Sequence, residues 1–348
     1  MPASATEREA AVRAAFAEQA GWCEKLGSPF TARLCTVLGR TLDRSTEVGH
    51  RVLEWPGDPS ATADALALRL CGGLHALVRS GAVPELAACY PPRPLPTEDG
   101  LASALERVLA REDLLPWLDS APQTNEVGRS AVLMSGLLAA ATALRAPFEL
   151  LELGASAGLN LILDRYGYDL GGVPAGTPGS PLRLCPDWQG APPPQAEVRV
   201  ARRRGVDLRP APDPDRLLAY VWPDHARRLE PAEKALALLA ADPPQIEAGD
   251  AADWIEMQLA SPAPEGTARV IMHSVACQYF PPETQARVTS AIEAAGARGP
   301  LGWLRMEKVP GDEYFSLRLR VWPGGEDRLL AWTHPHGASI SWLLPPAR

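Results

Sequence analysis

The stretch that most constrains the fold is a short apolar run followed by a glycine-rich turn near the middle of the chain. Residues 148–153 are mainly apolar, and Gly154, Ser156 and Gly158 follow at alternate positions. A second apolar segment, expected to be helical, covers residues 159–163. Glycines let a backbone turn tightly and approach a ligand, and a helix start offers unpaired N–H groups. We therefore expect a buried strand here, with a binding site at its carboxyl end.

An acidic residue, Glu152, lies near the end of this expected strand. A buried carboxylate is costly unless it meets a hydrogen-bond donor, which here could belong to a ligand. The spelling Glu-Leu-Gly-x-Ser-x-Gly resembles motif I of class I S-adenosylmethionine (SAM)-dependent methyltransferases, with Ser156 in place of the middle glycine. The resemblance implies that the methionine end of the cofactor is held by Glu152, Gly154, Ser156, Gly158 and Asn160.

A second interpretation of the same turn is a serine hydrolase, because the letters around Ser156 also spell the G-x-S-x-G nucleophile elbow. Asp250, followed by His334 or His336, would complete a catalytic triad in the hydrolase order. The elbow, however, follows the first expected strand of the sheet, and no glycine motif upstream supplies an oxyanion hole. Glu152 would also place a negative charge beside a developing oxyanion.

Composition narrows the class of protein. The 348 residues are 46% hydrophobic, yet no run of eighteen apolar residues occurs, so no transmembrane helix is expected. A net charge of −8 argues against a general nucleic-acid binder. The six cysteines form no C-x-x-C pair, which favours reduced thiols in the cytoplasm over disulfides or a zinc framework. We expect a cytoplasmic protein that acts on a small molecule.

Residues 1–120 are predicted to form a helical cap domain, with no strand before residue 147. The apolar spacing indicates helices at 5–27, 30–42, 62–79, 83–89, 99–110 and 112–118. The sequence Cys71-Gly-Gly-Leu-His75 lies inside one of these helices. We interpret its glycines as a point of close helix packing and His75 as a core or rim residue.

Polar residues cluster at the start of a long apolar helix expected over 127–144. Thr124 or Asn125 could cap this helix, and Glu126 and Arg129 could form a surface pair three residues apart. The functional alternative is that this helix start faces the glycine turn. On that view Asn125, Glu126 and Arg129 contact the substrate.

The segment 166–200 is rich in glycine and proline and is expected to be an irregular insertion with short strands. A second sheet strand follows, ending in Asp207. This residue could bind the ribose hydroxyls of the cofactor, but it lies 55 residues after Glu152. The spacing in dinucleotide-binding sheets is nearer ~20 residues, so the insertion must loop out. Further on, Gly249-Asp250-Ala251 resembles the methyltransferase motif beside adenine, although Asp250 could equally be a helix N-cap.

Polar side chains follow the strand expected at 268–273. His273, Gln278 and Tyr279 lie where ligands bind in open parallel sheets, off the carboxyl ends of the strands. A strand over 301–306 ends in Glu307, and two strands joined by a glycine turn, 314–322 and 328–333, read as a hairpin. We predict His273, Tyr279 and Glu307 as catalytic and Gln278 as a substrate contact; His273 could also be purely structural.

The turn after the hairpin contains His334 and His336. Their spacing, with His273 or Glu307, matches no closed zinc pattern, so no metal site is predicted. We instead expect the two histidines to shape the substrate pocket.

Several blocks together resemble one bacterial family, the domain-of-unknown-function family 2332: Gln-Thr-Asn-Glu, the glycine-turn block, Arg-Gly-Val-Asp, Val-Trp-Pro-Asp, His-Ser-Val-x-x-Gln-Tyr, Trp-Pro-Gly-Gly and His-Pro-His-Gly. The resemblance implies an α/β, Rossmann-like methyltransferase-type sheet, mostly parallel with a C-terminal antiparallel hairpin. This domain would span 121–348 and carry the insertion at 166–200. The expected function is SAM-dependent methylation of a small molecule. The alternatives are another function on the same fold, cofactor-free or SAM- or nucleoside-binding, and the serine hydrolase.

Overall fold

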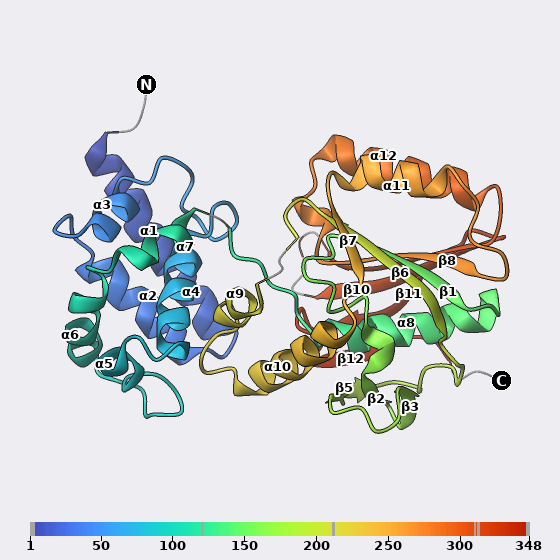
Figure 1. Ribbon diagram of the computed structural model, residues 1–348, viewed down its shortest axis with the longest axis horizontal. Coiled ribbons are helices and arrows are strands. Elements are labelled where there is room, and N and C mark those ends of the chain that lie inside the picture. Colours follow the sequence, from blue (N-terminus) through green and yellow to red (C-terminus); the bar gives the residue numbers. More distant parts are fainter. Residues whose placement is uncertain (1–3, 120, 211–212, 310, 312–313, 346–348) are drawn as a thin grey trace. The chain divides into compact units, whose positions relative to one another are not determined.

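The computed structural model describes residues 4–119, 121–210, 213–309, 311 and 314–345. The chain divides into two compact units (Figure 1). Unit 1 comprises residues 1–124 and 213–229, and unit 2 comprises residues 125–212 and 230–348. Residues 213–229, which were expected in the second domain, belong to unit 1 together with the N-terminal helices.

The described secondary structure of unit 1 is helical, as predicted. Its helices are α1 (Ala5–Lys25), α2 (Pro29–Thr41), α3 (Glu47–Leu53), α4 (Leu66–Arg79), α5 (Pro84–Ala87), α6 (Glu98–Val108), η1 (Glu112–Leu114), α7 (Leu115–Leu118) and α9 (Pro214–Ala219). Helix α1 starts with a capping box, in which the Ser4 hydroxyl and the Glu7 carboxylate each bond the other's backbone N–H. Helix α3 was not predicted, although Thr46 caps it by accepting the Gly49 N–H.

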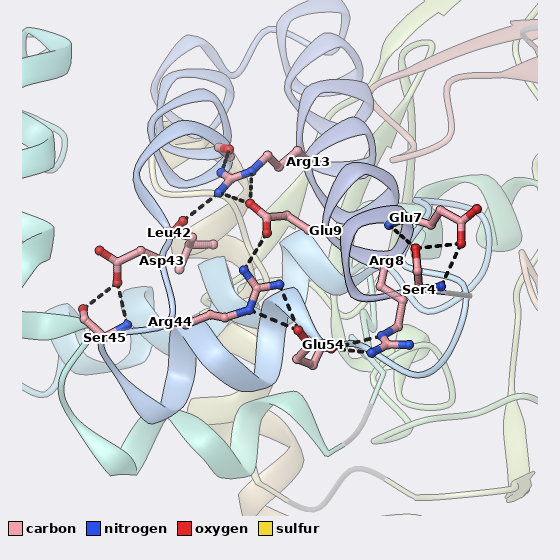
Figure 2. Close-up of polar contacts among 11 residues, drawn as sticks. Ser4, Glu7, Arg8, Glu9, Arg13, Leu42, Asp43, Arg44, Ser45 and Glu54 are labelled. Atoms are coloured by element: carbon pink, nitrogen blue, oxygen red, sulfur yellow. Dashed lines mark hydrogen bonds and ion pairs between the residues drawn. The ribbon is translucent and has the colours of Figure 1, made fainter. Parts of the chain in front are cut away.

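A network of ion pairs joins α1 to the segment around α3 on the surface of unit 1 (Figure 2). Arg44 bridges Glu9 and Glu54 at 2.6 and 2.8 Å, and Arg8 and Arg13 add contacts to the same two carboxylates. Exposed pairs contribute little singly, but Glu9 and Glu54 each hold two guanidinium groups. Helix α3 is too short to be stable alone, and the network adds to the burial of Val48, Val52 and Leu53 in holding it in position.

Residues 213–229 complete the core of unit 1. Two glycines of α4 leave space for aromatic rings: a Cβ on Gly72 would lie 2.4 Å from the Tyr220 ring, and one on Gly73 2.9 Å from that of Trp117. The predicted close packing at these glycines is confirmed. Asp224 accepts the Phe30 N–H at 2.8 Å and so caps α2 from 194 residues away. His75 is in the core, bonded to the Ala219 carbonyl, and burial lowers its pKa to about 4.

Unit 2 is built on a sheet of nine described strands in the order β5-β12-β11-β10-β9-β8-β1-β6-β7. The strands are β1 (Phe148–Leu153), β5 (Asp187–Gln189), β6 (Val200–Asp207), β7 (Gln245–Ala248), β8 (Ala268–Ser274), β9 (Leu301–Lys308), β10 (Phe315–Trp322), β11 (Asp327–Thr333) and β12 (Ser339–Trp342). Five neighbouring strands of this sheet, β9, β8, β1, β6 and β7, are parallel to one another. Strands β9 to β12 are antiparallel, and the predicted hairpin of β10 and β11 is confirmed.

Helices cover both faces of this sheet (Figure 1). They are α8 (Arg129–Leu144), α10 (Ala226–Ala241, which begins in unit 1), α11 (Ala251–Leu259) and α12 (Pro282–Gly296). Leu151 and Leu153 form one core with α11 and α12. Side chains alternate along a strand, so Glu152 points to the opposite face. There α8 packs so closely that a Cβ on Gly136 would lie 2.3 Å from Leu304.

The connection from β1 to β6 differs from the prediction. Residues 159–162 form turns rather than a helix, and only η2 (Leu163–Arg165) follows. The Leu159 N–H is taken by Asn125 and its carbonyl by the Tyr166 hydroxyl, so neither continues a helical ladder. The predicted insertion at 166–200 contains a small sheet, with β2 (Gly167–Leu170) between β3 (Val173–Gly176) and β4 (Arg183–Leu184).

Candidate functional site

The glycine turn after β1 adopts a backbone that few side chains tolerate. Gly154 and Gly158 have φ of +72° and +86°, and Ser156 between them has φ of +52°. Gly154 also lacks room for a side chain, because a Cβ would lie 2.6 Å from that of Ala276 in the loop after β8. Non-glycine residues with positive φ are strained and concentrate at functional sites. The turn therefore brings the ends of β1 and β8 into contact through a strained backbone.

Two side chains from distant segments hold the N–H groups of this turn. The Ser156 N–H donates to Asp207 Oδ2 at 2.9 Å, and the Leu159 N–H donates to Asn125 Oδ1 at 2.8 Å. Asn160 accepts a hydrogen bond from the Ser130 hydroxyl at 2.9 Å. Asp207 arrives here because β6 pairs with β1, despite the 55-residue separation. The structure thus brings these predicted residues together, whereas nothing in the sequence singled out Ser130.

Glu152 lies beside the turn as a buried acid, with only 1% of its surface exposed. Its Oε2 atom has no hydrogen-bond partner among the described residues, and neither does the buried Ser156 hydroxyl. Burial raises the pKa of the Glu152 carboxyl well above its usual range; the Asp207 charge raises it further, and the Arg129 charge opposes the rise. A buried oxygen of this kind calls for a donor from water or a ligand.

The start of α8 packs against the turn that carries the two C-terminal histidines. The Arg129 Nε–H donates to the Pro335 carbonyl at 2.9 Å, and Nη1 donates to the Ser274 carbonyl at 3.4 Å. The His336 N–H donates to His334 Nδ1 at 3.1 Å. Gly128 has no room for a side chain, since a Cβ would lie 2.2 Å from the His336 carbonyl oxygen.

Glu126 belongs to the same cluster, because its carboxylate accepts the Gly128 N–H at 3.2 Å. Glu126 and Arg129 are both buried rather than on the surface. The predicted substrate residues at the helix start and in the histidine turn therefore lie next to one another.

Asp250 is the N-cap of α11, which was the structural alternative to a contact with adenine. Its Oδ1 accepts the Ala252 and Asp253 N–H groups at 2.8 and 3.1 Å, and its Oδ2 accepts the Thr284 hydroxyl at 3.3 Å. Ala251 is the first residue of that helix. The preceding loop joins the end of β6, since the Gly249 N–H donates to the Asp207 carbonyl at 3.0 Å. Contact of Asp250 and Ala251 with adenine stays a prediction.

The buried His273 and the partly buried Glu307 form a pair at the ends of β8 and β9. The His273 Nδ1 atom lies 2.6 Å from Glu307 Oε1, and the Trp303 indole N–H donates to His273 Nε2 at 3.2 Å. These partners assign the proton to Nδ1, because a carboxylate accepts and an indole donates. Both ring nitrogens are thus engaged, and His273 is 2% exposed. In this geometry His273 has no free nitrogen with which to deprotonate a substrate.

Gln278 and Tyr279 lie on the surface rather than in the buried cluster. They belong to η3 (Cys277–Tyr279), directly after β8, and Tyr279 is 72% exposed. Their predicted roles would require a substrate that extends to this rim.

The hydrolase interpretation finds no support in the geometry. The Ser156 hydroxyl has no base as hydrogen-bond partner in the described chain, and Asp250 bonds a helix start and a threonine rather than a histidine. No group of three or more His, Cys, Asp or Glu suited to a metal ion occurs among the described residues. None of the helices in that part of the chain has the length and apolar character needed to cross a membrane.

Comparison with known proteins identifies the family. The family model described as "Uncharacterized protein conserved in bacteria (DUF2332)" matches residues 13–342. No curated protein and no solved structure matches the chain. Because the match covers almost the whole sequence, including both units and the glycine turn, the chain belongs to this bacterial family, as the sequence blocks indicated.

Proposed function

We propose that the protein binds SAM at the glycine turn and transfers its methyl group to a small-molecule acceptor. The observation that carries this proposal is the unpartnered, buried Oε2 atom of Glu152 beside a turn of positive-φ residues. The ammonium group of a bound amino-acid moiety would supply the missing donor. When bound, SAM supplies an electrophilic methyl group on a sulfonium.

The order of the parallel strands supports this ligand position. The five parallel strands are numbered 1 to 5 by their order in the chain: β1, β6, β7, β8 and β9. Across the sheet, these five strands lie in the order 3-2-1-4-5. This is the order of doubly wound nucleotide-binding sheets, in which ligands bind where the order reverses. The reversal falls between β1 and β8, where Gly154 meets Ala276. Asp207 ends β6, and its remaining lone pairs would accept the ribose hydroxyls of the cofactor.

The charge of the site argues for SAM over a phosphate-bearing cofactor. Pyrophosphate binding uses free backbone N–H groups at a helix start. Here the Ser156 and Leu159 N–H groups are already bonded to side-chain oxygens, and no α-helix follows the turn. The Asp207 carboxylate would repel a phosphate, whereas Asp207 and the ionised form of Glu152 would attract the ammonium and sulfonium groups of SAM.

Titration calorimetry on the full chain tests the proposal, with SAM, S-adenosylhomocysteine, ATP and NAD as ligands. We expect SAM and S-adenosylhomocysteine to bind, and ATP and NAD not to. A folded protein that binds neither sulfur compound would overturn the proposal. A binding module without methyl transfer is the second candidate, because His273 offers no free base; it would bind SAM yet methylate no acceptor.

A further inference from the structure

A second buried carboxylate oxygen, on Glu307, also lacks a donor in the part of the chain that the structure describes. Its Oε1 atom is bonded to His273 Nδ1 at 2.6 Å and accepts the Ala276 and Cys277 N–H groups, both at 3.1 Å. Its Oε2 atom is buried and has no partner among the described residues. One oxygen is thus held by three groups, and the other is held by none.

Glu307 is an ionised group. Burial acts to raise its pKa, but the hydrogen bonds from His273 and from the two backbone N–H groups hold the pKa below its usual value. The free oxygen is therefore a charged acceptor in a site of limited exposure. Such an oxygen forms its strongest hydrogen bond with a positively charged or strongly polarised donor.

The loop that Glu307 holds is the one that touches the glycine turn. Ala276 donates its N–H to Glu307, and its Cβ faces Gly154. Val275, just before it, has φ of +54°, an unusual value for a β-branched residue. The described chain has four non-glycine residues with positive φ, and two of them, Ser156 and Val275, lie in these two loops. Strain of this kind persists where the surroundings enforce it, commonly at ligand sites.

We infer that Glu307 Oε2 is the acceptor-side contact of the site and that it selects an acceptor whose reacting group is a nitrogen bearing hydrogen. The methyl-transfer part of this inference rests on the proposed function. The nitrogen lone pair forms the C–N bond while the C–S bond breaks with its electron pair on sulfur, so positive charge passes from sulfur to nitrogen. Glu307 stabilises that charge through the N–H group, and the proton then leaves to water.

His273 and Trp303 are positioning residues in this scheme. The indole N–H fixes the imidazole tautomer, and the imidazole holds Oε1, which leaves Oε2 for another donor. This arrangement explains why a histidine at the end of β8 is fully bonded rather than available as a base.

The test uses probes of similar size and different polar groups: benzylamine, benzyl alcohol and benzoate. Binding is followed by the ¹⁵N resonances of the His273 imidazole in the full chain, assigned with His273→Gln. We expect benzylamine to shift these resonances and benzoate to leave them unchanged. Glu307→Gln should weaken benzylamine binding by about tenfold or more, because a charge-assisted hydrogen bond is lost. Glu256→Gln, on an exposed ion pair of α11, is the matched control.

Benzoate binding as strong as that of benzylamine, the absence of any benzylamine shift, or equal affinity in a folded Glu307→Gln variant would each overturn the inference. Because this readout needs no SAM, its failure is distinguishable from that of the proposed function. SAM binding without a benzylamine effect would refute only the role of Glu307. A benzylamine effect without SAM binding would refute only the proposed cofactor.

Discussion

Replacing Glu152 by glutamine tests the central feature of the site. The variant keeps the shape of the side chain and removes its capacity to become charged. The hydrogen bond expected between Glu152 Oε2 and the SAM ammonium is charge-assisted, and such bonds contribute about 1.5–3 kcal/mol. Loss of that amount weakens binding about 10- to 150-fold. We therefore expect Glu152→Gln to raise the Kd for SAM by this factor.

The same substitution should stabilise the unliganded protein at neutral pH. Glu152 is an acid whose pKa is raised in the folded state, so the folded chain holds a proton that the unfolded chain releases. Wild-type stability therefore falls as pH rises from the usual glutamate value of 4.5 through the raised pKa, and the variant lacks this fall. The affinity of the wild type for SAM should rise over the same interval, because the ionised form binds the cation. Asp207 and Arg129 are the charged groups whose fields act on Glu152.

Calorimetry and thermal unfolding over a pH series measure both effects on one set of samples. The control is Glu256→Gln, whose carboxylate pairs with Arg287 on the surface of α11 and lies outside the site. Unchanged SAM affinity in Glu152→Gln, or a loss of stability equal to that of a disrupted core, would refute the reasoning. Weaker binding together with a higher melting temperature at neutral pH is the signature that we expect.

Three further predictions concern the scaffold. Arg269→Met removes the 2.7 Å partner of Glu149, which is 2% exposed and keeps only a 3.7 Å contact with Arg202. It should cost about 3–5 kcal/mol in urea unfolding, and combining it with Glu149→Leu should recover most of the loss. A double variant no better than the single one would contradict this. Gly72→Ala forces a Cβ to within 2.4 Å of Tyr220 and should lower the free energy of unfolding by about 1–3 kcal/mol. Gly21→Ala, whose Cβ would meet nothing within 4 Å, should instead stabilise α1 by about 1 kcal/mol. Thermal unfolding measures both changes. The pKa of the Cys23 thiol is raised by its hydrogen bond with Cys35 and by burial. Cys23 should therefore resist iodoacetamide in the native state, while the exposed Cys185 is modified. Equal labelling of the two cysteines in mass spectra would argue against this packing.

The elements that the sequence predicted well are those with local signals. Helix α1 has its capping box at Ser4 and Glu7, and the glycine pair between β10 and β11 marks a hairpin. The long apolar run of α8 predicted that helix to within a few residues. In each case the residues that decide the structure lie within a few positions of one another.

The features that the sequence did not predict depend on distant partners. Asp224 caps α2 across 194 residues, so the assignment of 213–229 to unit 1 has no local signal. The expected helix after the glycine turn does not form because Asn125 and Tyr166 take the backbone groups of Leu159. Trp303, which settles the tautomer of His273, lies 30 residues further along and is adjacent only through the pairing of β8 with β9.

The glycine turn illustrates why a motif does not by itself define the charge of its ligand. Glycines allow a ligand to approach closely, but the groups that the backbone N–H groups bond to decide whether the site favours an anion or a cation. If the amides of Ser156 and Leu159 were free, the turn would suit an anion. Because Asp207 and Asn125 occupy them, and because Glu152 and Glu307 each retain an oxygen with no donor among the described residues, the same turn suits a cation. Nucleotide binding with a phosphate preference would therefore require those two side chains to release the turn. We expect Asp207→Ala and Asn125→Ala, which remove the accepting oxygens, to gain affinity for ATP in calorimetry.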